Sequence, residues 1–67
     1  MTLFHHTVTA KEQNIRIDKL LSDVYKNASR SQIQKWINDG YVTVNGQEIK
    51  SNYKGQENDY IQIEIPK

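Results

Sequence analysis

The sequence lacks cysteine, has a single proline near its end, and contains no long apolar run. Without cysteine there can be no disulfide bond, thiolate zinc site or cysteine nucleophile. No stretch approaches the roughly 20 apolar residues of a membrane-spanning helix, and the first residues lack the basic head and apolar stretch of a signal peptide. A chain of 67 residues forms one domain, too small to enclose a large cofactor or a multi-part active site. We therefore expect a single cytoplasmic domain with no membrane segment.

The charge of the chain is nearly balanced in sum but unevenly distributed. Nine lysine and arginine residues stand against eight carboxylates, which gives a net charge of +1. Residues 16–54 carry seven basic and four acidic side chains, whereas residues 55–67 carry one basic and three acidic side chains. A nucleic-acid partner would therefore have to be recognised by local rather than overall charge. An ordinary solvated surface explains this distribution equally well, so charge alone does not identify a partner.

Two amphipathic helices are predicted in the first part of the chain. In the first helix, apolar side chains recur at the spacing of a helical stripe, namely at Ile17, Leu20, Leu21, Val24 and Tyr25. The second begins with Ser29 as N-cap and Gln32 three residues later, which is the pattern of a capping box. It ends before Gly40, because glycine readily adopts the left-handed conformation that follows a helix. The buried stripe of this helix consists of Ile33, Trp36 and Ile37.

After Gly40 the apolar pattern changes to the two-residue alternation of β-strands. Residues 41–44 alternate and are followed by Asn45 and Gly46, which tolerate the positive φ angles of a two-residue hairpin turn. Residues 47–49 would return as the partner strand, and residues 60–65 alternate again after a polar loop. Residues 3–9 could form an additional edge strand. We therefore predict an α+β fold in which two antiparallel-packed helices cover a small antiparallel sheet.

The start of the second helix is the clearest candidate for binding an anion. The free N–H groups and the dipole of a helix N-terminus favour negative charge, and Arg30 adds a forked donor suited to phosphate oxygens. Gln34 and Lys35 lie one turn after Arg30 and Ser31, on the same exposed rows of the helix. Ser29 itself is explained by capping alone.

Other polar and aromatic residues have simpler explanations. Asp18 is favourable near the start of the first helix because of the helix dipole, whereas Arg16 has no comparable structural explanation. Trp36 could stack on a base, but it shares its stripe with two isoleucines and is assigned to the core. Tyr53, in the polar loop, is the better candidate for an exposed aromatic side chain.

No catalytic or metal-binding constellation is recognisable. His5 and His6 resemble half of a metal site, but there is no thiol and no carboxylate at ligand spacing. No serine, histidine and aspartate form a credible catalytic set, and there is no glycine loop to hold phosphates. We therefore expect neither enzymatic activity nor a metal or other cofactor in this chain.

Four segments at characteristic spacing resemble a known family. They are Arg16-Ile17-Asp18-Lys19-Leu20-Leu21, Ser29-Arg30-Ser31-Gln32-Ile33, Gly40-Tyr41-Val42-Thr43-Val44-Asn45-Gly46 and Asp59-Tyr60-Ile61. In this order they resemble the S-four RNA-binding domain, the module shared by ribosomal small-subunit protein four, tyrosyl-tRNA synthetase tails and several pseudouridine synthases. The resemblance implies RNA held across the helix pair and an adjacent strand loop. The matching positions, together with Lys54 in the following loop, give the expected RNA-binding set: Arg16, Lys19, Arg30, Ser31, Gln34, Lys35, Asn45, Gly46, Lys50 and Lys54.

Two further positions qualify this resemblance. Asp18 matches a family position that is better interpreted as structural than as an RNA contact. Asn58 stands where many relatives have glycine, and since asparagine tolerates the left-handed conformation, we expect the turn to be kept.

The flanking residues narrow the resemblance. Residues 4–9, the order Ser-Arg-Ser-Gln-Ile-Gln from Ser29, and the close at residues 63–66 resemble the N-terminal appendage of the large-subunit pseudouridine synthase family. In that family a catalytic domain follows, so the chain would be either an excised domain or a stand-alone homologue. We expect residues 1–15 to be an N-terminal extension and residues 16–67 to be a monomeric, non-catalytic module for structured RNA, in the first place ribosomal RNA. The alternative is a module that docks on a ribosomal protein, or on its own catalytic domain, through an exposed edge of the last strand.

Overall fold

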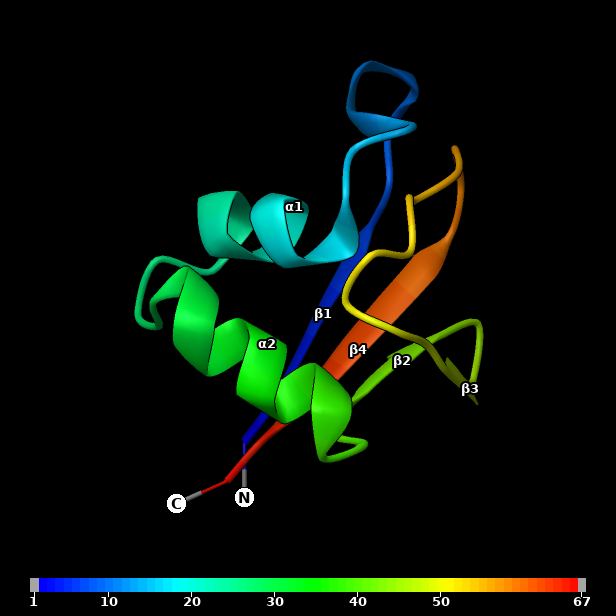
Figure 1. The fold of residues 1–67 in the computed structure, drawn as a ribbon. Coiled ribbons are helices and arrows are strands. Elements are labelled where there is room, and N and C mark those ends of the chain that lie inside the picture. Colours follow the sequence, from blue (N-terminus) through cyan, green and yellow to red (C-terminus); the bar gives the residue numbers. More distant parts are fainter. Residues whose placement is uncertain (1, 67) are drawn as a thin grey trace.

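The computed structural model describes residues 2–66 as two α-helices packed on a four-stranded antiparallel sheet (Figure 1). This arrangement confirms the predicted α+β class, including the additional N-terminal strand. No helix within these residues is long and apolar enough to cross a bilayer. The elements in chain order are β1 (Thr2–Thr7), a short 3-10 helix η1 (Ala10–Glu12), α1 (Ile17–Val24), α2 (Arg30–Asn38), β2 (Val42–Val44), β3 (Gln47–Glu48) and β4 (Tyr60–Ile65).

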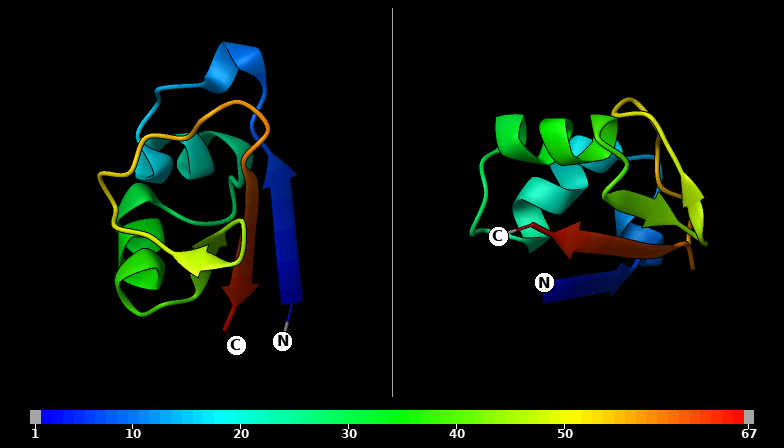
Figure 2. Two further views of the ribbon diagram at one scale, coloured as in Figure 1. Left: turned by 90° about the vertical axis from the view of Figure 1, so that its right-hand side faces the viewer. Right: turned by 90° about the horizontal axis from the view of Figure 1, so that it is seen from below.

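The last strand, β4, lies inside the sheet rather than at its edge. The strand order is β1-β4-β2-β3, and both Phe4 of β1 and Val42 of β2 lie opposite Ile63 of β4. Figure 2 shows β1 and β4 side by side along their length. The expectation that the last strand presents an exposed edge is therefore wrong. Strands adjacent in sequence usually become neighbours, but here β1, the strand most distant in sequence, covers that edge.

Both helices cover the same face of the sheet, and the core lies between the two layers (Figure 2). The alternation of β4 directs Ile61 and Ile63 into this core and leaves Tyr60 exposed on the opposite face, where Leu3 of β1 is also exposed. Trp36 is buried in the core, as its position in the helical stripe predicted. Five other predicted stripe residues of the helices are buried, namely Ile17, Leu20, Leu21, Ile33 and Ile37, whereas Val24 and Tyr25 are half-buried and pack against the core.

The predicted end points of α2 and of the hairpin are confirmed by the backbone. The Ser29 side chain accepts a hydrogen bond from the Gln32 N–H at 3.1 Å; no reciprocal bond from the Gln32 side chain occurs within residues 2–66, so only half of the capping box forms. Gly40 follows α2 with a φ of 86°. Asn45 and Gly46 have φ values of 54° and 83°, as a type I′ hairpin turn requires. Asn58 also adopts the expected left-handed conformation, with a φ of 73°.

The N-terminal segment is an integral part of this sheet and core. All six residues of β1 pair with β4. Val8, which follows β1, is buried, and its backbone N–H donates to the Asp59 carbonyl at 2.9 Å while its carbonyl accepts from the Asn58 N–H at 2.8 Å. The ring of Phe4 packs edge-on against Tyr25, with centroids 5.0 Å apart. Residues 2–8 therefore complete the layer on which the helices rest.

Ile63 offers a test of the assigned core face. We predict that Ile63→Val lowers the free energy of unfolding by about 0.5–1.5 kcal/mol, because a buried methylene group is lost. Leu3→Ala, at a side chain that is 54% exposed on the opposite face, should change stability by less than about 0.5 kcal/mol. Urea unfolding followed by circular dichroism compares the two variants, and equal losses would contradict the assignment of the faces.

Candidate functional site

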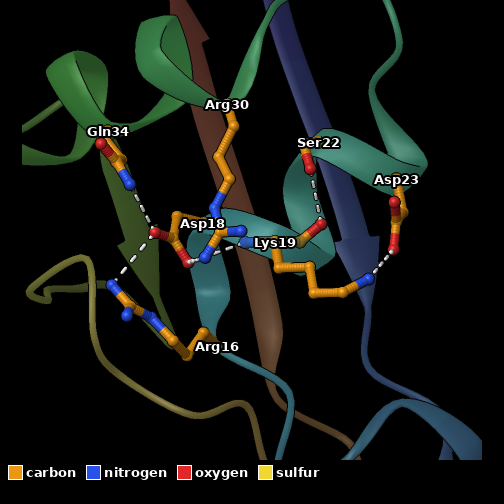
Figure 3. Close-up of polar contacts among 7 residues, drawn as sticks. All are labelled: Arg16, Asp18, Lys19, Ser22, Asp23, Arg30 and Gln34. Carbon is orange, nitrogen blue, oxygen red and sulfur yellow. Dashed lines mark hydrogen bonds and ion pairs between the residues drawn. The ribbon is translucent and has the colours of Figure 1, made fainter.

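The carboxylate of Asp18, in the first turn of α1, lies beneath a group of polar and basic side chains (Figure 3). Its side chain is 0% exposed. Oδ2 accepts hydrogen bonds from Gln34 Nε2 at 2.7 Å and from Arg16 Nη2 at 3.2 Å. Oδ1 accepts from the backbone N–H of Lys19 at 2.8 Å and from Arg30 Nη2 at 3.4 Å. One buried carboxylate therefore joins the segment before α1 to the first turns of α2.

These contacts determine the charge state of Asp18. Burial by itself would raise its pKa, but the hydrogen bonds from Gln34, Arg30 and the Lys19 N–H, with the Arg30 charge, outweigh burial and lower the pKa below its ordinary value. Asp18 is therefore ionised at neutral pH. The helix dipole explains only part of the structural role of Asp18. Its side chain also accepts a hydrogen bond from Gln34, sixteen residues further along the chain.

The two arginines at this carboxylate retain unused donors. A guanidinium group has five N–H donors in a planar fork, and each of these arginines directs one Nη atom to Asp18. Both side chains are 46% exposed. The remaining donors of Arg16 and Arg30 are therefore available to an anion at the surface.

The loop between β3 and β4 is held against the start of α1. Arg16 and Lys54 form an isolated antiparallel β-bridge, and the Ile17 N–H donates to the carbonyl of Tyr53 at 2.6 Å. The bridge places the exposed Lys54 next to Arg16, although the two residues are 38 positions apart in sequence. The loop thus adds a third basic residue to the two arginines around Asp18.

A second buried carboxylate, Asp59, ties the hairpin turn to this loop. It accepts hydrogen bonds from Asn45 Nδ2 at 3.0 Å, from the Tyr53 hydroxyl and from the Gln56 N–H at 2.9 Å. The Asn45 Oδ1 accepts from the Tyr60 N–H at 2.9 Å. The amide of Asn45 is therefore engaged at both its nitrogen and its oxygen within the fold.

The same contacts shift the pKa values of both partners. The hydrogen bond to Asp59, followed by burial and the Asp59 charge, raises the pKa of Tyr53 to about 12. Burial would raise the pKa of Asp59, but the hydrogen bonds from Tyr53, Gln56 and Asn45 lower it overall. The expectation that Tyr53 is an exposed aromatic is wrong. Its side chain is half-buried and packs on the core, and its hydroxyl donates a hydrogen bond to Asp59. Its polar neighbours in sequence carry no signal for this burial.

The ten predicted site residues differ in their surroundings. Gln34 is half-buried and the other nine are exposed. The structure brings Arg16, Arg30 and Gln34 together at Asp18, with Lys54 alongside. The other exposed members are distributed over the helices, the hairpin turn and the loop: Lys19, Ser31, Lys35, Asn45, Gly46 and Lys50.

Two of these lysines form ion pairs within their own helices. Lys19 Nζ lies 3.2 Å from Asp23 Oδ2, and Lys35 Nζ lies 3.4 Å from Asp39 Oδ2. All four side chains are largely exposed, and such surface pairs contribute little to stability. The lysines can therefore exchange these carboxylates for another anion at small cost.

The histidines belong to the far end of β1. His6 Nε2 lies 2.9 Å from Glu12 Oε1, and hydrogen bonds from the Thr9 N–H and from His6 lower the pKa of Glu12. The sequence analysis found no carboxylate at ligand spacing from the histidines, but the fold brings Glu12, six residues further along, next to His6. Within residues 2–66 no group of three or more metal-ligating side chains is assembled.

The chain is similar to known proteins over most of its length. A family model described as S4 domain matches residues 15–61, which is more than half of the chain. An uncharacterized RNA pseudouridine synthase of Bacillus subtilis strain 168, YlyB, is 40% identical over 60 residues, covering 90% of this chain and 20% of the relative. An uncharacterized RNA pseudouridine synthase of Chlorobaculum parvum is 36% identical over 56 residues, covering 84% of this chain and 17% of the relative. The ribosomal large subunit pseudouridine synthase D of Yersinia pestis is 42% identical over 43 residues, covering 64% of this chain and 13% of the relative.

The chain thus spans a fifth or less of the length of these curated relatives. The matched region is their S4-like part, so the chain does not correspond to the catalytic part of such an enzyme.

The ionised state of Asp18 predicts a loss of stability in acid. Because the pKa of Asp18 is lower in the folded than in the unfolded chain, the unfolded chain binds a proton more readily. The stabilisation is complete above the ordinary value of 3.8 and is lost as the pH falls from there through the folded pKa. We expect the stability difference between the wild type and Asp18→Asn to shrink over this range. Urea unfolding at a series of pH values measures it, and a difference independent of pH would contradict the prediction.

Proposed function

The chain belongs to the S4 domain family, a family of RNA-binding domains, and from this we propose that it binds structured RNA through the surface around Asp18. We further propose that the parent protein is a pseudouridine synthase and that this domain positions its catalytic part on ribosomal RNA. A ribosomal RNA target would place the protein in the cytoplasm. The name of the Yersinia pestis relative, a ribosomal large subunit enzyme, supports this class of target.

The observation that carries the proposal is the convergence of forked donors on one exposed surface. Arg16 and Arg30 meet at Asp18 from two separate elements, and Lys54 is paired to Arg16 along the backbone. Guanidinium groups bind phosphate oxygens in a bidentate manner, which fixes geometry as well as charge. The surface therefore suits a phosphate backbone held in a defined orientation.

The same surface favours recognition of RNA shape over base sequence. In A-form helices the major groove is too deep and narrow for side chains to read, so proteins contact phosphates, 2′-hydroxyls and the shallow minor groove. Lysine and arginine donors suit such contacts. Two aromatic side chains were considered for contacts with bases, but Trp36 is buried in the core and Tyr53 packs against the core with its hydroxyl bonded to Asp59. Contacts to the backbone and to overall shape are thus the mode of binding that the residues support best.

The docking alternative loses its structural support. It depended on an exposed edge of the last strand, and β4 is paired on both sides, by β1 and by β2. The described basic residues instead gather on the helices and the loop. Within residues 2–66, β4 therefore presents no free edge to a protein partner.

Binding through phosphates predicts a strong dependence on salt. If about 4 phosphates are neutralised, the logarithm of the association constant should fall against the logarithm of salt concentration with a slope of about −3 to −4. Fluorescence anisotropy with a labelled RNA stem-loop at several potassium chloride concentrations measures this slope. A flat response would contradict the electrostatic mode of binding.

Charge-matched lysine variants test whether the location of the charge matters. We predict that Lys35→Gln with Lys54→Gln weakens RNA binding about tenfold or more, because two contacts to phosphate are lost. Lys11→Gln with Lys26→Gln removes the same charge from exposed positions outside the predicted set and should weaken binding about threefold or less, through the long-range field alone. Arg30 is left unchanged, since its loss would take a partner from the buried Asp18.

The thermal midpoints of both double variants serve as the control for folding. All four lysines are exposed, so each variant should unfold close to the wild type. Equal weakening of RNA binding by the two pairs would show that net charge, rather than this surface, governs the interaction.

A further inference from the structure

We propose that Asp18 is a positioning residue whose buried negative charge strengthens RNA binding, by holding Arg16, Arg30 and Gln34 in the orientation in which they meet the RNA. This inference rests on the proposed RNA-binding function. It is opposite in sign to what simple electrostatics predicts, because a carboxylate under a phosphate-binding surface should repel the ligand.

The position of Asp18 excludes a direct contact with RNA. Its side chain is 0% exposed, and both carboxylate oxygens are occupied by donors between 2.7 and 3.4 Å. Any effect of Asp18 on RNA binding must therefore be transmitted through the residues that it holds.

Those residues have no other common anchor among residues 2–66. Arg16 precedes α1, whereas Arg30 and Gln34 lie one turn apart on α2. Within residues 2–66, the hydrogen bonds that their side chains make are the ones to Asp18. Without that carboxylate, two long and flexible guanidinium side chains would have to be ordered at the moment of binding. Ordering of this kind opposes association, and preorganised side chains avoid it.

Other acidic residues of the same helices provide the contrast. Among residues 2–66, Asp23 on α1 pairs only with the Lys19 side chain, at 3.2 Å, and its own side chain is 59% exposed. It is open to solvent and, among these residues, holds no arginine. Its negative charge should therefore act on RNA by repulsion alone, which makes it the matched control for Asp18.

The test compares Asp18→Asn with Asp23→Asn, each of which removes one negative charge from α1. Binding of a fluorescein-labelled RNA stem-loop is measured by anisotropy at fixed salt, after thermal unfolding has established that each variant is folded at the assay temperature. We expect Asp18→Asn to bind about tenfold or more weakly than the wild type, because the asparagine keeps only one acceptor oxygen and no charge, whereas the arginines use both carboxylate oxygens. Asp23→Asn should bind as tightly as the wild type or more tightly. A folded Asp18→Asn that binds as tightly as the wild type would overturn the inference.

A second measurement on the wild type needs no folded variant. Order parameters of the arginine Nε–H groups, measured by NMR without RNA, should lie above about 0.6, the value below which a group counts as flexible. Values below about 0.6 in the free protein, rising only when the stem-loop is added, would show that the RNA and not Asp18 orders the arginines.

These outcomes separate the inference from the proposed function. If the wild type fails to bind the stem-loop and large-subunit ribosomal RNA, the RNA-binding function fails. If the wild type binds and Asp18→Asn binds equally well, the function stands and only the positioning role of Asp18 is rejected.

Discussion

The proposed binding surface is built around one buried carboxylate. Asp18 links the segment before α1 to α2 through hydrogen bonds from Arg16, Arg30 and Gln34. A buried charge is stable only when its hydrogen-bonding capacity is satisfied, and these donors meet that requirement while fixing the two elements relative to each other. The same carboxylate therefore links the two helical segments and orients the basic side chains that they carry.

A second carboxylate does the same for the loop that lies against the start of α1. Asp59 gathers the hairpin turn and the loop before β4 through Asn45, Tyr53 and the Gln56 N–H. The pairing of Arg16 with Lys54 joins this loop to the contacts around Asp18. A loop of about ten polar residues would otherwise be costly to order. Two internal anions and one backbone bridge thus hold a surface built from three separate segments.

Local sequence patterns predict the elements of this fold but not the contacts between them. The ends of α2 and the turn at Asn45-Gly46 were predictable because capping and positive φ angles depend on adjacent residues. The inner position of β4 and the burial of Tyr53 were not, since both depend on segments distant in sequence. The candidate site divides in the same way. The residue types around Arg30 indicated anion binding, whereas the convergence on Asp18 required the folded chain.

The small net charge of +1 follows from the same organisation. Two of the eight carboxylates of the chain, Asp18 and Asp59, are consumed inside the fold, where they orient side chains rather than shape the outer field. A strongly basic coat would bind any polyanion, because phosphate neutralisation supplies affinity without regard to sequence or shape. A nearly neutral domain with a few oriented donors loses that general affinity and keeps the part that depends on the arrangement of phosphates. Under the proposed RNA-binding function, this balance of charge favours discrimination between RNA shapes over general affinity.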